Sequence, residues 1–385
     1  MDLTTLGYAL LFGLSVFTAD SVIYADSYSL RAEVHEDVGR AGYTRQYVES
    51  YFAYEMRRTF RHESVVKPVA LRAGGEASVT AALTDPLGAD RLRSALQSLF
   101  QVDPLSLEVY LLPAGDDIRA VGFGSRPSGA FFEFSTQAGG RPPQVFLGEV
   151  AMQAALVIDP YHARLAQARQ LPREGAAAAE ATRKLVAELG ARAPAAPTPG
   201  PSASVPVPAP APERRDDAAL SHLEGMLALR GGDLDQAEIL LKRALAENPG
   251  MVAAQINLSL VNLLRGRHLP SLTLARQAES ALPTRTELRP KAMRHLRGAI
   301  YATAAFNAEA VQQANLAETL WQRACADLPQ LGPLLAGRGS AWLPARTVTA
   351  CWKPLDREAQ AAFDAYAWEL AALGPLPAAR PGSGR

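Results

Sequence analysis

Few residues in this 385-residue chain stand at spacings that could perform catalysis. Ser64 and Lys67 have the Ser-x-x-Lys spacing in which a lysine can activate a serine nucleophile. That chemistry requires the serine at a helix start, together with Ser-Asp-Asn and Lys-Thr-Gly elements. Here the stretch precedes Pro68 in a β-like run, and neither element occurs. The glycine-rich stretch 122–129 fits no phosphate-binding pattern and is typical of a hairpin turn. We therefore predict that the protein is not an enzyme.

The sequence does not indicate a metal site or a cofactor. The six histidines are scattered without a His-Glu-x-x-His motif, and the two cysteines, Cys325 and Cys351, form no Cys-x-x-Cys pair. In an oxidising compartment these cysteines could form one disulfide, which would close a short loop rich in Pro and Gly. Two ordinary thiols are the other interpretation, and the sequence leaves both open.

The charge balance gives no reason to expect nucleic acid or an acidic polymer as a partner. Lys plus Arg and Asp plus Glu number 39 each. The length predicts two or three folded units. Recognition of another protein is the function class that remains. It requires helices or strands that together form a binding surface.

Such elements are indicated by a pattern that returns at a fixed interval along the chain. Gly232 and Gly266 lie 34 residues apart in predicted turns. Pro249 and Pro283, which follow predicted helices, are separated by the same 34 residues. Small residues in between let two helices pack closely, and proline ends each unit because it cannot continue a helix. A third copy at 298–331 has Gln312 in place of the turn glycine.

This pattern resembles the tetratricopeptide repeat, with copies at 218–251, 252–285 and 298–331. The resemblance implies antiparallel helix hairpins that stack into an all-α solenoid and bind an extended protein segment in a concave groove. Family positions that face this groove place six residues there: His222, Met226, Arg230, Ile256, Asn257 and Leu260. Asn257 matches a position where the family often binds peptide backbone. The basic residues of a carboxylate clamp are absent, which favours an apolar or mixed partner segment.

A basic ridge is predicted just before the third copy. Lys291, Arg294 and Arg297 recur every three residues and should share one helix face. Such a ridge is either a solvated surface or a dock for an acidic peptide or a lipid headgroup.

Residues 1–26 are predicted to be a membrane anchor. Residues 3–19 are uncharged, and 17 helical residues span about 25 Å, slightly less than a hydrocarbon core. A cleaved signal peptide and a buried helix are the alternatives. The anchor would place the protein in the inner membrane with a single pass. The few flanking charges leave the side of the soluble part open.

Residues 27–165 are predicted to form an α+β module, a small sheet covered on one face by helices. The expected helices and strands are a helix over 42–60, a strand over 64–71, a helix over 87–100, strands over 106–113, 117–124 and 129–137, and a helix over 142–161. The Gly-Tyr-Thr at 42–44, the strand pair around Val109 and Val121 and the Asp-Pro-Tyr at 159–161 resemble single-pass bacterial proteins of unassigned activity. In those proteins an N-terminal α+β module precedes tetratricopeptide repeats, so the resemblance implies an architecture and not a reaction.

Residues 166–217 read as an Ala/Pro-rich linker and 332–385 as a helix and tail. Between Pro194 and Pro212 the chain has no charged or aromatic residue and should form an extended spacer. The last predicted helix, with an apolar stripe that includes Phe363 and Tyr366, should cap the open end of the repeats. The sequence thus predicts a membrane-anchored scaffold or adaptor that binds a protein partner through its repeats. The alternative is an accessory subunit whose α+β module binds a small molecule or an envelope component while the repeats dock it.

Overall fold

The structure is a computed structural model of two compact units. The first comprises Met1–His62 and Val69–Ala163, and the second comprises Glu63–Pro68 and Arg164–Arg385. The predicted anchor, the predicted helix over 87–100 and most of the Pro-rich linker lie outside the described residues. The described residues are 28–60, 64–66, 105–125, 131–171, 180–182, 184–185, 211–284, 288–336, 351, 353, 357–366 and 368–373.

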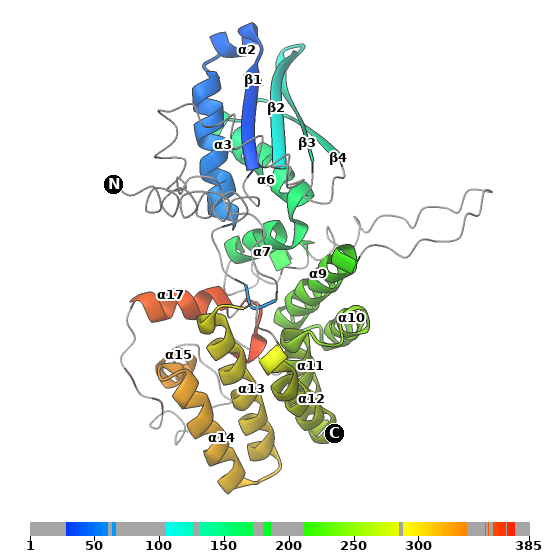
Figure 1. Ribbon diagram of the computed structural model, residues 1–385, viewed down its shortest axis with the longest axis vertical. Coiled ribbons are helices and arrows are strands. Elements are labelled where there is room, and N and C mark those ends of the chain that lie inside the picture. Colours follow the sequence, from blue (N-terminus) through cyan, green and yellow to red (C-terminus); the bar gives the residue numbers. More distant parts are fainter. Residues whose placement is uncertain are drawn as a thin grey trace, which may run out of the picture. The chain divides into compact units, whose positions relative to one another are not determined.

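The first unit contains a four-stranded sheet in the order β1-β2-β3-β4 (Figure 1). The sequence predicts the three strands β2 (Leu105–Ala114), β3 (Asp117–Ser125) and β4 (Phe131–Gln137), which pair as an antiparallel meander. The strand β1 (Tyr28–Val34) pairs in parallel with β2 and was not predicted. Ser64–Val66, predicted to begin a strand, has no strand structure and belongs to the second unit.

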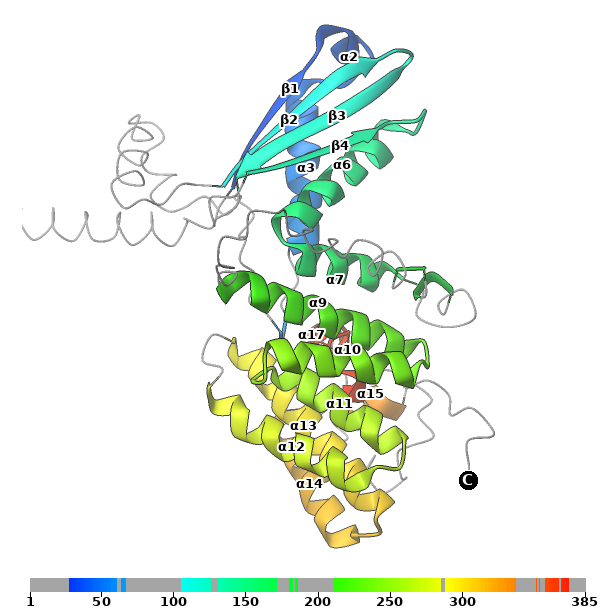
Figure 2. The same ribbon diagram turned by 90° about the vertical axis from the view of Figure 1, so that its right-hand side faces the viewer.

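Helices α3 (Arg45–Phe60) and α6 (Pro143–Ile158) cover one face of the sheet (Figure 2). Alternate residues of the strands point toward these helices, as period-two strand geometry requires. Gly122 of β3 leaves room for the Phe134 ring, because a Cβ at Gly122 would lie 2.1 Å from that ring. Apolar side chains fill the space between the sheet and the helices, among them Phe52, Leu107, Phe132 and Phe146.

The tripeptides 42–44 and 159–161 lie at helix starts in the structure. Gly42 has a φ of 97°, Tyr43 is buried against Phe146, and the Thr44 hydroxyl accepts a hydrogen bond from the Tyr47 N–H at 3.2 Å. In the second motif the Asp159 carboxylate accepts from the backbone N–H of His162 and also contacts its imidazole, and the following helix α7 (Pro160–Gln170) begins at a proline. Their described contacts are those of capping and packing.

The second unit contains three helix pairs. They are α9 (Ala211–Arg230) with α10 (Leu234–Glu247), α11 (Val252–Leu264) with α12 (His268–Ala281), and α13 (Pro290–Ala310) with α14 (Ala314–Asp327). The second pair ends in a short 3-10 helix, η3 (Leu282–Thr284). The sequence predicts all three hairpins, although α9 begins upstream of the predicted first copy. Their first helices α9, α11 and α13 lie next to each other, and we call the surface that they form the inner face.

Small residues allow the two helices of each pair to approach closely. A Cβ on Gly225 of α9 would lie 2.9 Å from the Leu241 side chain of α10. In the second pair the hydroxyl of Ser259 hydrogen-bonds the carbonyl of Ser271 at 2.7 Å, and both residues are fully buried. These two pairs therefore have contacts that a larger residue at these positions would disrupt.

The turns within the three pairs share one backbone conformation. Gly232, Gly266 and Gln312 have φ values of 77°, 71° and 61°. Only glycine adopts this left-handed region without a steric cost. The third turn thus keeps the geometry of the other two without the residue that favours it.

We predict that Gln312→Gly raises the free energy of unfolding by about 1 kcal/mol, because it relieves this left-handed conformation. Urea unfolding followed by circular dichroism measures the change. Gln312→Ala is the matched control, because alanine keeps a Cβ and therefore the same steric cost at a φ of 61°. Equal effects of the two substitutions would contradict the prediction.

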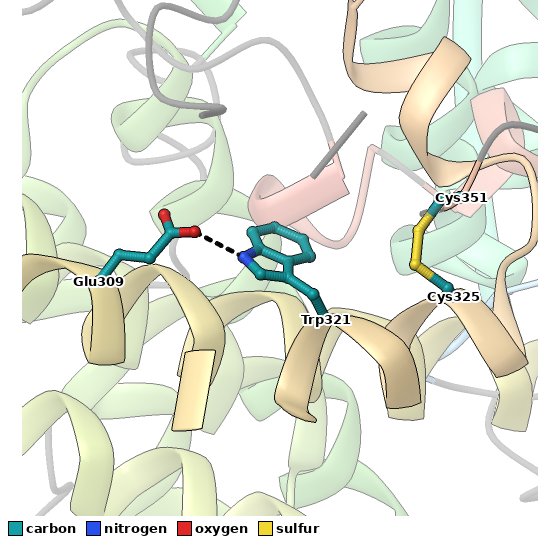
Figure 3. Close-up of a disulfide and its surroundings, with 4 residues drawn as sticks. All are labelled: Glu309, Trp321, Cys325 and Cys351. Atoms are coloured by element: carbon teal, nitrogen blue, oxygen red, sulfur yellow. Dashed lines mark hydrogen bonds between the residues drawn. A yellow bond between two sulfur atoms is a disulfide. The ribbon is translucent and has the colours of Figure 1, made fainter. Parts of the chain in front are cut away.

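The C-terminal part of the chain follows the third pair. Helix α15 (Leu331–Ala336) comes directly after it, and α17 (Arg357–Tyr366) and a short 3-10 helix, η4 (Ala371–Leu373), come later. Cys351 is joined by a disulfide to Cys325 of α14, with the two Cα atoms 5.1 Å apart (Figure 3). On the same helix, the Trp321 indole donates to the Glu309 carboxylate at 2.8 Å. The disulfide therefore ties the segment that precedes α17 to the last helix pair.

No helix among the described residues is both long and apolar enough to cross a membrane.

Candidate functional site

The predicted groove residues lie on the inner face, and the chain's own C-terminal segment covers them. The 3-10 helix η4 contacts α9, α11 and α13, the first helix of every pair. His222, Met226, Ile256, Asn257 and Leu260 are all buried. The predicted last helix, α17, ends at Tyr366, and η4 follows it on the inner face.

Asn257 is the central polar group of this site. Its carboxamide nitrogen donates to the backbone carbonyl of Glu369 at 2.8 Å, and its oxygen accepts from the Ala371 N–H at 3.0 Å. One side chain thus satisfies a backbone carbonyl and a backbone N–H of the covering segment. In a continuing helix these two groups would have been satisfied by the helix itself. This bidentate contact recognises backbone and does not depend on the side chains at positions 369 and 371.

His222 completes the contact as a neutral imidazole. Its Nε2 lies 2.8 Å from the Asn257 carboxamide nitrogen, whose hydrogens make it a donor, so Nε2 must accept. Burial lowers the pKa of His222 to about 3, an effect that the Glu369 backbone partly offsets. A proton on Nε2 would face the Asn257 N–H group, so the site requires the unprotonated ring.

Aromatic residues of the covering segment contact side chains of the inner helices. The guanidinium carbon of Arg230 lies 3.8 Å from the ring centroid of Trp368, and the His295 and Tyr366 rings are 4.5 Å apart. Arg230, the one predicted groove residue that is partly exposed, therefore holds an aromatic ring by a cation–π contact.

A second segment of the chain reaches the same place. The carboxylate of Glu369 is fully buried and accepts from the Ser64 hydroxyl and from the Val65 N–H, the latter at 3.2 Å. Burying a charge is costly unless it is hydrogen-bonded, so these contacts make the acidic side chain tolerable there. Ser64, first considered as a nucleophile, has this structural contact.

The basic ridge is exposed, and its Arg297 is paired with an acidic residue. Lys291, Arg294 and Arg297 are exposed on α13. The Arg297 guanidinium donates to Asp327 of α14 at 2.7 Å, and this hydrogen bond raises the pKa of Arg297. The ion pair weakens the ridge as an anion-binding surface, because it offsets one of the three charges.

On the inner face the Asn257 side chain bonds the backbone of the chain's own residues 369 and 371. Among the described residues, no cluster of His, Cys, Asp or Glu side chains is placed to hold a metal ion. Sequence reasoning missed Ser64, Trp368 and Glu369 as parts of this site. The apolar stripe around Phe363 was the only signal, and it indicated burial without indicating where.

Comparisons with protein-family models, with curated proteins and with solved structures found no match for this chain.

Proposed function

We propose that this protein is a scaffold or adaptor of the tetratricopeptide type, which binds a segment of a partner protein on its inner face. The observation that carries the proposal is the Asn257 carboxamide, which holds the backbone of a peptide segment through the Glu369 carbonyl and the Ala371 N–H. A face that binds backbone in this way suits a peptide ligand. The contact lies where the repeat pattern places its ligand-binding residues.

Three features support the assignment of the helix pairs to this repeat type. The pairs follow one fixed interval, with an insertion before the third, and their turns share a left-handed residue. Small residues also stand where the helices of a pair approach most closely. The turn residues and small residues thus have roles that such a repeat would require, which supports the assignment.

The alternative function, in which the α+β module binds a small molecule or an envelope component, has less support. The covered side of its sheet is filled by apolar side chains such as Val109 and Phe134. A ligand site requires convergent polar groups, and a filled apolar core provides none. The filled core favours the scaffold over the accessory subunit.

We further propose that residues 1–26 anchor the protein in the inner membrane and that the helical unit lies in an oxidising compartment. The disulfide between Cys325 and Cys351 supports this location, because disulfides persist in such compartments and are rare in the cytosol. Protease added to intact spheroplasts should then destroy a C-terminal tag.

Capture of partners with a matched pair of variants tests the proposed function. Asn257→Ala removes the backbone contact, whereas Asn307→Ala removes another buried carboxamide whose bonds go to His268 of the neighbouring pair. After crosslinking in cells, we expect proteins that are recovered with the wild type and with Asn307→Ala to fall at least tenfold with Asn257→Ala. Equal recovery with both variants would contradict a partner site on the inner face.

A further inference from the structure

We infer that the C-terminal segment Phe363–Leu373 is a built-in ligand of the inner face, and that a partner must displace it with a segment of the same chemistry. That chemistry is an aromatic residue at the Arg230 position, a turn of backbone on Asn257 and an aliphatic residue after it. This inference rests on the proposed function, because it concerns the ligand and the regulation of the same face.

The contacts that hold this segment are those expected for a bound ligand. Beyond Tyr366 its described residues form a short turn and η4 with local backbone hydrogen bonds, and the inner helices add side-chain contacts to this backbone. Its recognition groups come from separate helices: Arg230 from α9, Asn257 from α11 and His295 from α13. Trp368, Leu370 and Leu373 are buried by this arrangement.

The built-in segment is tethered near the inner face by the disulfide, and this tether lets it compete with a partner. The disulfide and the hydrogen bond from the Lys353 N–H to the Pro329 carbonyl, at 3.2 Å, fix Cys351 and Lys353 beside the end of α14. Only a short stretch then separates this point from Tyr366. A short tether gives an effective concentration in the millimolar range, so the segment can occupy the face with modest intrinsic affinity.

Ser64–Val66, which we call the strap, is held next to the built-in segment. Its Ser64 hydroxyl and Val65 N–H bond the buried Glu369 carboxylate, so the two segments cover the inner face together. Withdrawal of one would leave polar groups of the other without these bonds. A partner with an acidic residue at the Glu369 position would keep the strap in place, and a partner without it would not.

A binding experiment with a peptide of residues 357–374 tests the inference. The full chain carries Trp368→Ala and Leu370→Ala to weaken the built-in segment, and the fluorescently labelled wild-type peptide is added in trans. Fluorescence anisotropy should show affinity at least tenfold tighter for this opened chain than for the wild type. Adding Asn257→Ala to the opened chain should remove the gain, and adding Asn307→Ala should not. A peptide with both alanines is the control ligand.

Two results would overturn the inference. If the opened chain loses its helical circular dichroism, or keeps it without binding the peptide, the segment is a fixed part of the core. If the wild-type and opened chains bind equally, the peptide binds elsewhere. The capture experiment with Asn257→Ala and Asn307→Ala judges the proposed function separately, because it measures recovery of partner proteins and does not use the peptide of residues 357–374.

Discussion

The helical unit should lose stability as the pH falls below 6.5, and His222 should account for much of that loss. The pKa of this histidine is lowered from 6.5 to about 3 by burial. The unfolded chain therefore binds a proton below pH 6.5 that the folded chain does not bind until about pH 3. The contribution of His222 to the free energy of unfolding is therefore fully present above pH 6.5. Below that pH the free energy of unfolding declines by roughly 1.4 kcal/mol per pH unit.

Urea unfolding of the wild type and of His222→Gln between pH 7.5 and 5 measures this effect. Glutamine can still accept from the Asn257 carboxamide through its oxygen, but it cannot be protonated in this range. Burial raises the pKa values of Glu224 and Glu309, which acts in the opposite direction at acid pH. Their contributions cancel in the difference between the two proteins. Parallel pH profiles for wild type and variant would show that His222 does not titrate as the structure requires.

Removal of the disulfide should cost about 3.5 kcal/mol of unfolding free energy. Cys325 and Cys351 are 26 positions apart, and a cross-link of this loop length restricts the unfolded chain by that amount in the entropic description. The double variant Cys325→Ser/Cys351→Ser should unfold at lower urea than the oxidised wild type. The same difference should vanish when both proteins are measured in reductant, which serves as the control. Equal midpoints under oxidising conditions would contradict a stabilising cross-link.

The sequence predicted the helix pairs because their signals are local. Glycine in the turns, small residues between helices and proline after them act within a single hairpin, so their regular recurrence was sufficient. Gln312 shows the limit of this reasoning. It keeps the left-handed turn without glycine, because the packing of α13 against α14 imposes the geometry.

The features that the sequence did not predict depend on distant contacts. Strand β1 pairs with β2 from Tyr28 to Val34, and its partner lies far along the chain. The apolar stripe of Phe363 and Tyr366 correctly indicated that these residues are buried. It could not indicate where, because a helix at the end of the repeats and a helix near the inner face would have the same stripe. The deciding contacts join Asn257 to residues 369 and 371, more than a hundred positions away. No local rule contains that information.

Hydrogen exchange of the full chain, with and without an excess of the peptide 357–374, tests most directly whether the inner face is a peptide-binding site. We predict that the peptide accelerates exchange of the backbone amides over 366–373, including the Ala371 N–H, while α9, α11 and α13 remain protected. The segment would then be leaving a site that stays folded. If residues 366–373 exchange only together with these helices, and the peptide changes nothing, the inner face is a closed core and the proposed function is wrong.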